Sequence, residues 1–264
     1  MEKMKKYIGL LVAFSKASFI SDMEYRLNFV NRIAMDVVWY AVQIFAFEVL
    51  FRHTTHLGGW TVEQVRVFLG VLFAVDAIYM YVFSENLDHF VELVRKGDLD
   101  LLLAKPVSAQ FMVSFRKFHS ASLVNFTMAV AWLWWSLSFI PDFNPWRLLW
   151  LLVIFPCGLA VIYTIRFFFC SLALIFTRSD NLQFVWYHLW KLGQRPDSIY
   201  VPWFRYFLLS ALPVGIIGSV PARLLMEQES LWLVPWSLGI SFLMLGFSRR
   251  FWHFCLRQYS SASS

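Results

Sequence analysis

The sequence predicts an all-α integral membrane protein with six transmembrane helices, and three observations lead to this prediction. The 264-residue chain is 59% hydrophobic and only 15% charged, and its mean hydropathy of +0.58 exceeds that of soluble proteins. Apolar windows of about 20 residues, long enough to cross a hydrocarbon core, recur along it. Lysine and arginine gather in the segments that would lie on one side of the membrane.

We expect residues 1–30 to form an amphipathic helix that lies at the cytoplasmic interface. Lys3, Lys5 and Lys6 precede a short apolar run, an arrangement that also occurs in secretory signal peptides. Lys16 interrupts the run early and no clear small-residue cleavage site follows, so we interpret the segment as mature protein. Such a helix keeps its charges among the lipid headgroups and its apolar face in the acyl boundary.

Two apolar windows come next, followed by a charged segment. The windows Asn31–Phe51 and Val65–Ser84 are each long enough to cross a membrane. The charged segment, residues 85–112, begins with a pattern that predicts an amphipathic helix ending at Gly97. The apolar residues of this helix share one face: Leu87, Phe90, Val91 and Val94.

Beyond Gly97, the charged segment predicts a second short helix. Asp98 is placed to cap the apolar turn Leu99–Ala104, and Pro106 ends it. The resulting pair of helices is apolar enough to lie against a membrane or a helix bundle. It is also charged enough to bind a soluble domain.

Three further windows have clear limits. The third, Val113–Ile140, ends at the turn signal Pro141–Pro145. The fourth, Trp146–Phe176, is long enough to tilt. The last, Leu231–Phe247, is followed by three arginines.

Residues 178–230 have enough apolar side chains for one crossing and part of another. We favour a short fifth crossing near Asn181–Leu192 and then an outer re-entrant hairpin over residues 193–230, because broken helices are tolerated where protein surrounds them. The alternative is a fifth crossing at Trp203–Val220 preceded by an interfacial helix. The prolines that interrupt the hairpin are Pro196, Pro202, Pro213 and Pro221.

Positive charge predicts the orientation. Cationic residues cluster before the first window, between the second and third, and after the last. Both termini and the charged segment are therefore expected in the cytoplasm, and six crossings fit this parity. The net charge of +6 indicates contact with anionic membrane lipids, and it does not argue for nucleic acid.

The order of these segments resembles the ABC-2 type permease, the membrane subunit of an ABC exporter. The more specific resemblance is to an ABC-2 subfamily formerly of unknown function, with the signature R-x-G-x-L-D-x-L-L-L-K-P-V. The matching block is Val94–Ser108, in which Ala104 is inserted before Lys105. A second, looser block combines Pro196–Arg205 with Leu212–Ala222.

The resemblance implies a single transmembrane domain over residues 1–264, similar to type V exporters, in the bacterial inner membrane. It implies that the charged segment contains a coupling helix seated in a groove of a cytoplasmic ATPase subunit. Two ATPase subunits and a second permease, identical or a sister chain, would complete the exporter. The residues expected to contact the ATPase are Glu92, Arg95, Lys96, Gly97, Asp98, Leu99, Asp100, Leu102, Leu103, Lys105 and Pro106.

Catalytic motifs are not evident in the sequence. It contains no Gly-x-x-x-x-Gly-Lys-Ser/Thr loop, so we expect ATP and magnesium on the partner subunit, no cofactor on this chain and no enzyme activity of its own. His53 and His56 have no nearby carboxylate or cysteine in the sequence, so no metal site is expected. An ion-coupled secondary transporter or a membrane scaffold is the alternative, although no inverted repeat is evident.

Three ionisable residues lie within the predicted crossings, where charge is costly. Asp76 and Arg166 are each roughly 12 to 15 Å from the cytoplasmic end of their windows, at 1.5 Å per residue. These similar depths allow a salt bridge that acts as a structural clamp, as a gate or as part of a substrate path. Asp36, in the first crossing, is a second possible partner for Arg166.

Overall fold

The computed structural model describes residues 2–141, 143–176, 180–226 and 231–259. Regular structure in these ranges is helical, apart from one isolated bridge between Leu57 and Trp60, in agreement with the predicted all-α class. The longer helices are α1 (Glu2–Glu24), α2 (Arg26–Phe51), α3 (Val62–Tyr79), α4 (Glu85–Lys96), α7 (Ala121–Leu137), α8 (Leu148–Ser171), α9 (Asp180–Gly193), α10 (Pro202–Ser210), α11 (Ser219–Met226) and α12 (Leu233–Gln258). The shorter ones are η1 (Met80–Ser84), α5 (Leu99–Leu103), α6 (Ala109–Phe115), η2 (Pro145–Arg147), η3 (Leu172–Leu174), η4 (Asp197–Ile199) and η5 (Val214–Ile216).

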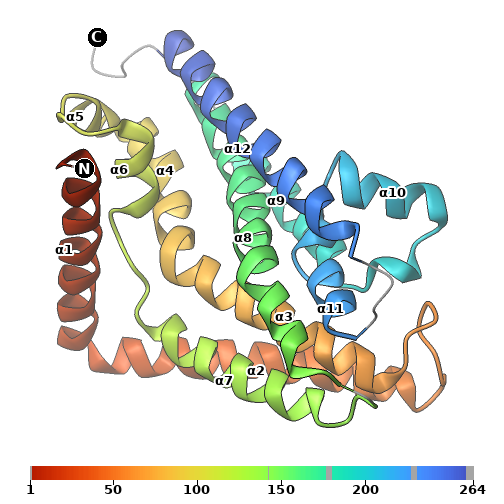
Figure 1. The fold of residues 1–264 in the computed structure, drawn as a ribbon. Helices are drawn as coiled ribbons and strands as arrows, with labels where there is room; N and C mark the ends of the chain where they lie inside the picture. The colour runs from red at the N-terminus through yellow and green to blue at the C-terminus, as the bar shows by residue number, and fades with distance from the viewer. Residues whose placement is uncertain (1, 142, 177–179, 227–230, 260–264) are drawn as a thin grey trace.

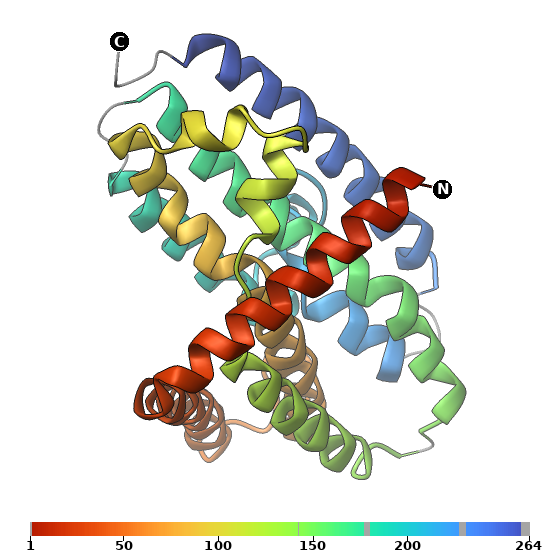
Figure 2. The same ribbon diagram turned by 90° about the vertical axis from the view of Figure 1, so that its left-hand side faces the viewer.

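The start of α1 and the last turns of α12 lie toward the same end of the molecule (Figure 1). Helix α5 also lies toward this end, whereas the loop after α2 and helix α10 lie toward the other (Figure 1). Helix α1 runs across the direction of α2 and over one face of the bundle (Figures 1 and 2). This placement of α1 is consistent with an interfacial helix that turns into the first crossing.

The main core forms around α3. Helix α3 packs against α7, and α8 packs against α12. Gly70 permits the close approach of α3 to α7, because a Cβ at this position would lie 2.9 Å from the Cα of Leu133. Nearly every residue of α3 from Val65 to Tyr79 is buried, so this helix forms the centre of the bundle.

Three stretches within the described residues are long and apolar enough to cross a membrane. They are α2, the continuous helix Val62–Lys96 and the helical stretch Pro145–Leu174. Helix α7 is shorter and apolar, and its 17 residues correspond to about 26 Å. Its helices therefore make the chain a multi-pass membrane protein. The count of six crossings stays a prediction.

Three predicted boundaries are wrong. Helix α1 ends at Glu24, and α2 already begins at Arg26, earlier than Asn31. The helix of the second window does not end at Ser84, because a π-helical turn, η1, carries it on into α4. The third window is split, since α6 ends at Phe115 and α7 begins only after a non-helical link.

The segment after α8 follows the favoured prediction in its helices. Helix α9 covers the expected range Asn181–Leu192, whereas Trp203–Val220 is divided among α10, η5 and the start of α11 instead of forming one crossing. Helix α11 is buried against α3 and α8. Each predicted hairpin proline stands at or near the start of a short helical segment, where proline is well tolerated. These prolines are Pro196 before η4, Pro202 in α10, Pro213 before η5 and Pro221 in the first turn of α11.

Candidate functional site

The first half of the charged segment is the amphipathic helix α4. Leu87 and Phe90 are fully buried, while Asp88 and His89 are exposed on the opposite side. The helix ends at Gly97, as predicted, because this residue has a φ of +76°, a left-handed conformation that glycine adopts without steric cost. The chain can therefore turn sharply from α4 into α5.

The second half of the charged segment contains α5, which has both buried and exposed leucines. Leu99 and Leu102 are buried in a cluster with Met112 and Trp252, so they attach the turn to the bundle. Leu103, expected with Leu99 and Leu102 to contact the ATPase, is 37% exposed. Leu101, which the sequence reasoning did not select, is 68% exposed and forms an apolar tip beside it.

Charged residues of the segment divide into paired and unpaired groups. Lys96 lies 2.7 Å from Glu92, and its hydrogen bond and positive charge lower the pKa of that carboxyl group. Arg95, Asp98 and Lys105 are exposed and form no ion pair with any residue that the structure describes. Asp98 occupies the N-cap position of α5, but its side chain makes no capping hydrogen bond, so the predicted cap is wrong.

The start of α1 is joined to the end of the charged segment, a contact that the sequence did not predict. The Lys6 ammonium donates to the Pro106 carbonyl at 3.2 Å, and the Ser108 N–H donates to the Tyr7 hydroxyl at 3.3 Å. The Tyr7 ring packs edge-on against Phe111, with centroids 4.7 Å apart. A displacement of the charged segment would therefore also affect α1.

The ion pair of Arg166 differs from the predicted one. The guanidinium, 2% exposed, lies 2.5 Å from the carboxylate of Asp88 on α4 and over the ring of Trp186. Asp76 instead accepts a hydrogen bond from the Tyr40 hydroxyl at 3.4 Å, and Asp36 accepts one from Asn125 at 2.5 Å. The predicted pairs of Arg166 with Asp76 and Asp36 are therefore replaced by a link between α8 and the charged segment.

This error has a structural cause. The turn η1 does not end the helix, so α3 and α4 form one continuous helix from Val62 to Lys96. Asp88 lies twelve residues beyond Asp76 on it, about 18 Å at 1.5 Å per residue. Arg166 is therefore level with α4 and not with Asp76, so the similar depths expected from hydropathy are wrong.

A second ionic cluster lies in the predicted outer hairpin. Buried Asp197 forms an ion pair with buried Arg223 of α11, and Arg205 of α10 lies 3.5 Å from the other carboxylate oxygen. The Asp197 N–H also donates to Ser219 at 3.0 Å. Arg223 was missed, although an arginine in so apolar a stretch is itself a signal of a structural or functional role. Among the described residues, no three histidine, cysteine or acidic side chains gather as a metal site.

Comparison with known proteins gives one match. A family model described as ABC-2 family transporter protein matches residues 37–263. No curated protein and no solved structure matches the chain. The matched range includes the charged segment, the Asp88–Arg166 pair and the cluster around Asp197.

Proposed function

Because the chain belongs to the ABC-2 family of transporter proteins, we propose that it is the permease subunit of an ATP-driven exporter. It forms the substrate pathway, and separate cytoplasmic ABC ATPase subunits bind ATP and magnesium. Permeases of this family generally work with such subunits. Two ATPase subunits and a second permease, identical or a sister chain, complete the assembly.

The proposed topology has six crossings in the bacterial inner membrane. These are α2, α3, α7, α8, α9 and α12, with both termini in the cytoplasm and α10–α11 as an outer re-entrant hairpin. Support comes from the termini and α5, which lie toward the same end of the molecule (Figure 1). Arginines at the end of α12 and lysines in α1 fit the cytoplasmic excess of positive charge.

One observation carries the proposal: a single continuous helix, Val62–Lys96, extends from the core to the charged segment. Its outer half, α3, lies at the centre of the bundle, and its inner end carries exposed Arg95. An ATPase that binds this end more strongly in one nucleotide state biases the position of the whole helix.

The surface that we propose for the ATPase contact contains fewer residues than the resemblance implies. Arg95, Asp98 and Lys105 are exposed and supply the charged contacts, and Leu101 with Leu103 supplies the apolar ones. Leu99 and Leu102 face the bundle and stabilise the surface from below. The Asp88–Arg166 pair then transmits a displacement of α4 to α8.

The test uses the full chain, co-expressed with a candidate ABC ATPase from the same organism and reconstituted in nanodiscs. Arg95→Ala and Leu101→Ala are each expected to weaken the complex about five- to thirtyfold, the effect of losing about 1–2 kcal/mol at an interface. The ATP hydrolysis that the permease stimulates is expected to fall in the same variants. Arg250→Ala is the matched control, an exposed arginine outside the charged segment.

Two results would contradict the proposal. One is an unchanged complex and unchanged ATP hydrolysis in both variants of the charged segment. The other is transport by the purified chain that follows a proton or sodium gradient without any ATPase, which would identify a secondary transporter instead.

A further inference from the structure

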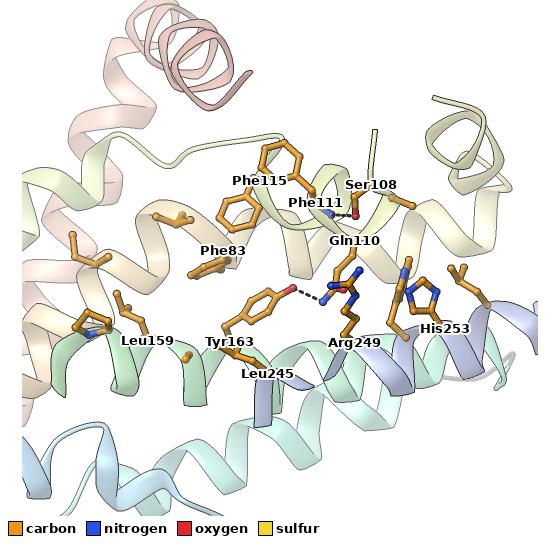
Figure 3. A pocket seen from close by; sticks show the side chains of 17 residues that line it. Phe83, Ser108, Gln110, Phe111, Phe115, Leu159, Tyr163, Leu245, Arg249 and His253 are labelled. Atoms are coloured by element: carbon orange, nitrogen blue, oxygen red, sulfur yellow. Dashed lines mark hydrogen bonds between the residues drawn. The ribbon is translucent and has the colours of Figure 1, made fainter. Parts of the chain in front are cut away.

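A cavity of about 920 Å³ opens on the bundle between α6, α8, α12 and the end of α3 (Figure 3). Its size is that of a site for a small organic molecule. The end of the charged segment, from Ser108 to Phe111, lines it, but Arg95, Leu101 and Lys105 do not. The cavity is therefore a feature separate from the proposed ATPase contact.

The cavity has a polar end and an apolar end. Arg249 and His253 of α12 lie near Gln110 at one end, whereas Phe83 and Leu159 line the other (Figure 3). Apolar side chains make up most of the wall. The shape and polarity thus suit an amphiphile whose headgroup lies at Arg249 and whose apolar chain lies along α8.

The charge of the cavity selects for an anion. Arg249 and His253 are four residues apart, so both face the same side of α12. Neither forms an ion pair within the described part of the chain, and no described residue that lines the cavity carries a carboxylate. An arginine fork binds a phosphate through two parallel hydrogen bonds.

Two further polar groups of the wall, on Gln110 and Tyr163, already form hydrogen bonds within the protein. Gln110 donates to the Tyr163 hydroxyl at 3.2 Å and to Ser248 at 3.4 Å, and the hydroxyls of Ser114 and Tyr163 are 2.9 Å apart. The Gln110 amide nitrogen and the Tyr163 hydroxyl therefore need no partner from a ligand. An alkyl chain can pass these two groups without leaving them unpaired.

The apolar part of the cavity is long enough for part of an acyl chain. Its lining residues on α8 run from Pro156 to Tyr163, which at 1.5 Å per residue is about 10 Å. Half of a hydrocarbon core of about 30 Å is about 15 Å. Basic pockets between transmembrane helices are known to bind the headgroups of anionic lipids.

We propose that this cavity binds one anionic phospholipid of the surrounding membrane. Its phosphate is held by Arg249 as an ion pair and by His253 as a hydrogen-bond donor, and an acyl chain lies between Phe83 and Leu159. The proposal does not depend on the ATPase partner, because the site is built from this chain alone.

Native mass spectrometry of the purified full chain tests this site. The chain is titrated with phosphatidylglycerol and with phosphatidylcholine of the same acyl length. The first phosphatidylglycerol is expected to bind about tenfold more tightly, and Arg249→Gln to remove that preference. Arg250→Gln is the matched control, since this neighbouring exposed arginine does not line the cavity.

A second variant tests the acyl chain. Ala160→Leu fills part of the apolar end and is expected to weaken binding of both lipids, while size-exclusion chromatography verifies the fold. Equal losses in Arg249→Gln and Arg250→Gln would overturn the proposal, as would unchanged binding in Ala160→Leu. Loss of lipid on dimerisation of the chain would also overturn it, in favour of a second copy as the occupant.

Discussion

The charged residues of this protein include ion pairs that connect helices and single charges that are exposed at the surface. Asp88 and Arg166 connect α4 to α8, and Asp197 and Arg223 connect the start of the hairpin to α11. Such pairs hold elements at a defined position, because breaking one leaves a desolvated charge. Arg95, by contrast, is exposed at the surface that we propose for the ATPase.

Asp197→Asn is expected to lower the free energy of unfolding by about 3–5 kcal/mol, since it removes the negative charge beside buried Arg223. Thermal unfolding in detergent measures the change. Arg205→Gln is the control, because Arg205 is partly exposed and 3.5 Å from the carboxylate, and its loss should be much smaller. Equal losses in the two variants would show that the Arg223 pair is not the main contribution.

At the scale of elements, the joint between α4 and α5 depends on Gly97. Its φ of +76° is costly for any residue with a Cβ, so Gly97→Ala is expected to destabilise the protein by about 1 kcal/mol. It should also reduce ATPase stimulation by displacing α5. Gly9→Ala in helix α1 is the control, because its Cβ would meet nothing within 4 Å and alanine favours helix.

The measurements are thermal unfolding and ATP hydrolysis by the reconstituted complex. If Gly97→Ala and Gly9→Ala have the same stability and the same activity, the turn after α4 does not depend on the left-handed conformation. A loss in Gly97→Ala alone would connect the geometry of the joint to coupling.

The arrangement of the whole molecule predicts which ends face the cytoplasm. A membrane-impermeant maleimide applied to spheroplasts is expected to label Thr55→Cys in the loop after α2. It should label Lys105→Cys only after permeabilisation. Both positions are exposed, and the loop after α2 and helix α5, which precedes Lys105, lie toward different ends of the molecule (Figure 1). The native chain is the control, since its three cysteines are buried. The reverse pattern would overturn the orientation.

The sequence by itself determined the all-α membrane class, the turn at Gly97 and the breaks at the hairpin prolines. Each of these depends on local chemistry: the length of an apolar run, a glycine after an amphipathic helix, or a proline that starts a helix. The signature Val94–Ser108 also led correctly to the family that the match over residues 37–263 shows.

Only the tertiary structure decided which charges meet. Hydropathy predicts similar depths for Arg166 and Asp76, but the level at which two helices meet depends on how they pack along their lengths. The helix continues through η1 into α4, and Arg166 is level with Asp88, about 18 Å beyond Asp76. The cavity beside Arg249 is likewise set by the packing of helices that are distant in the sequence, which no local pattern records.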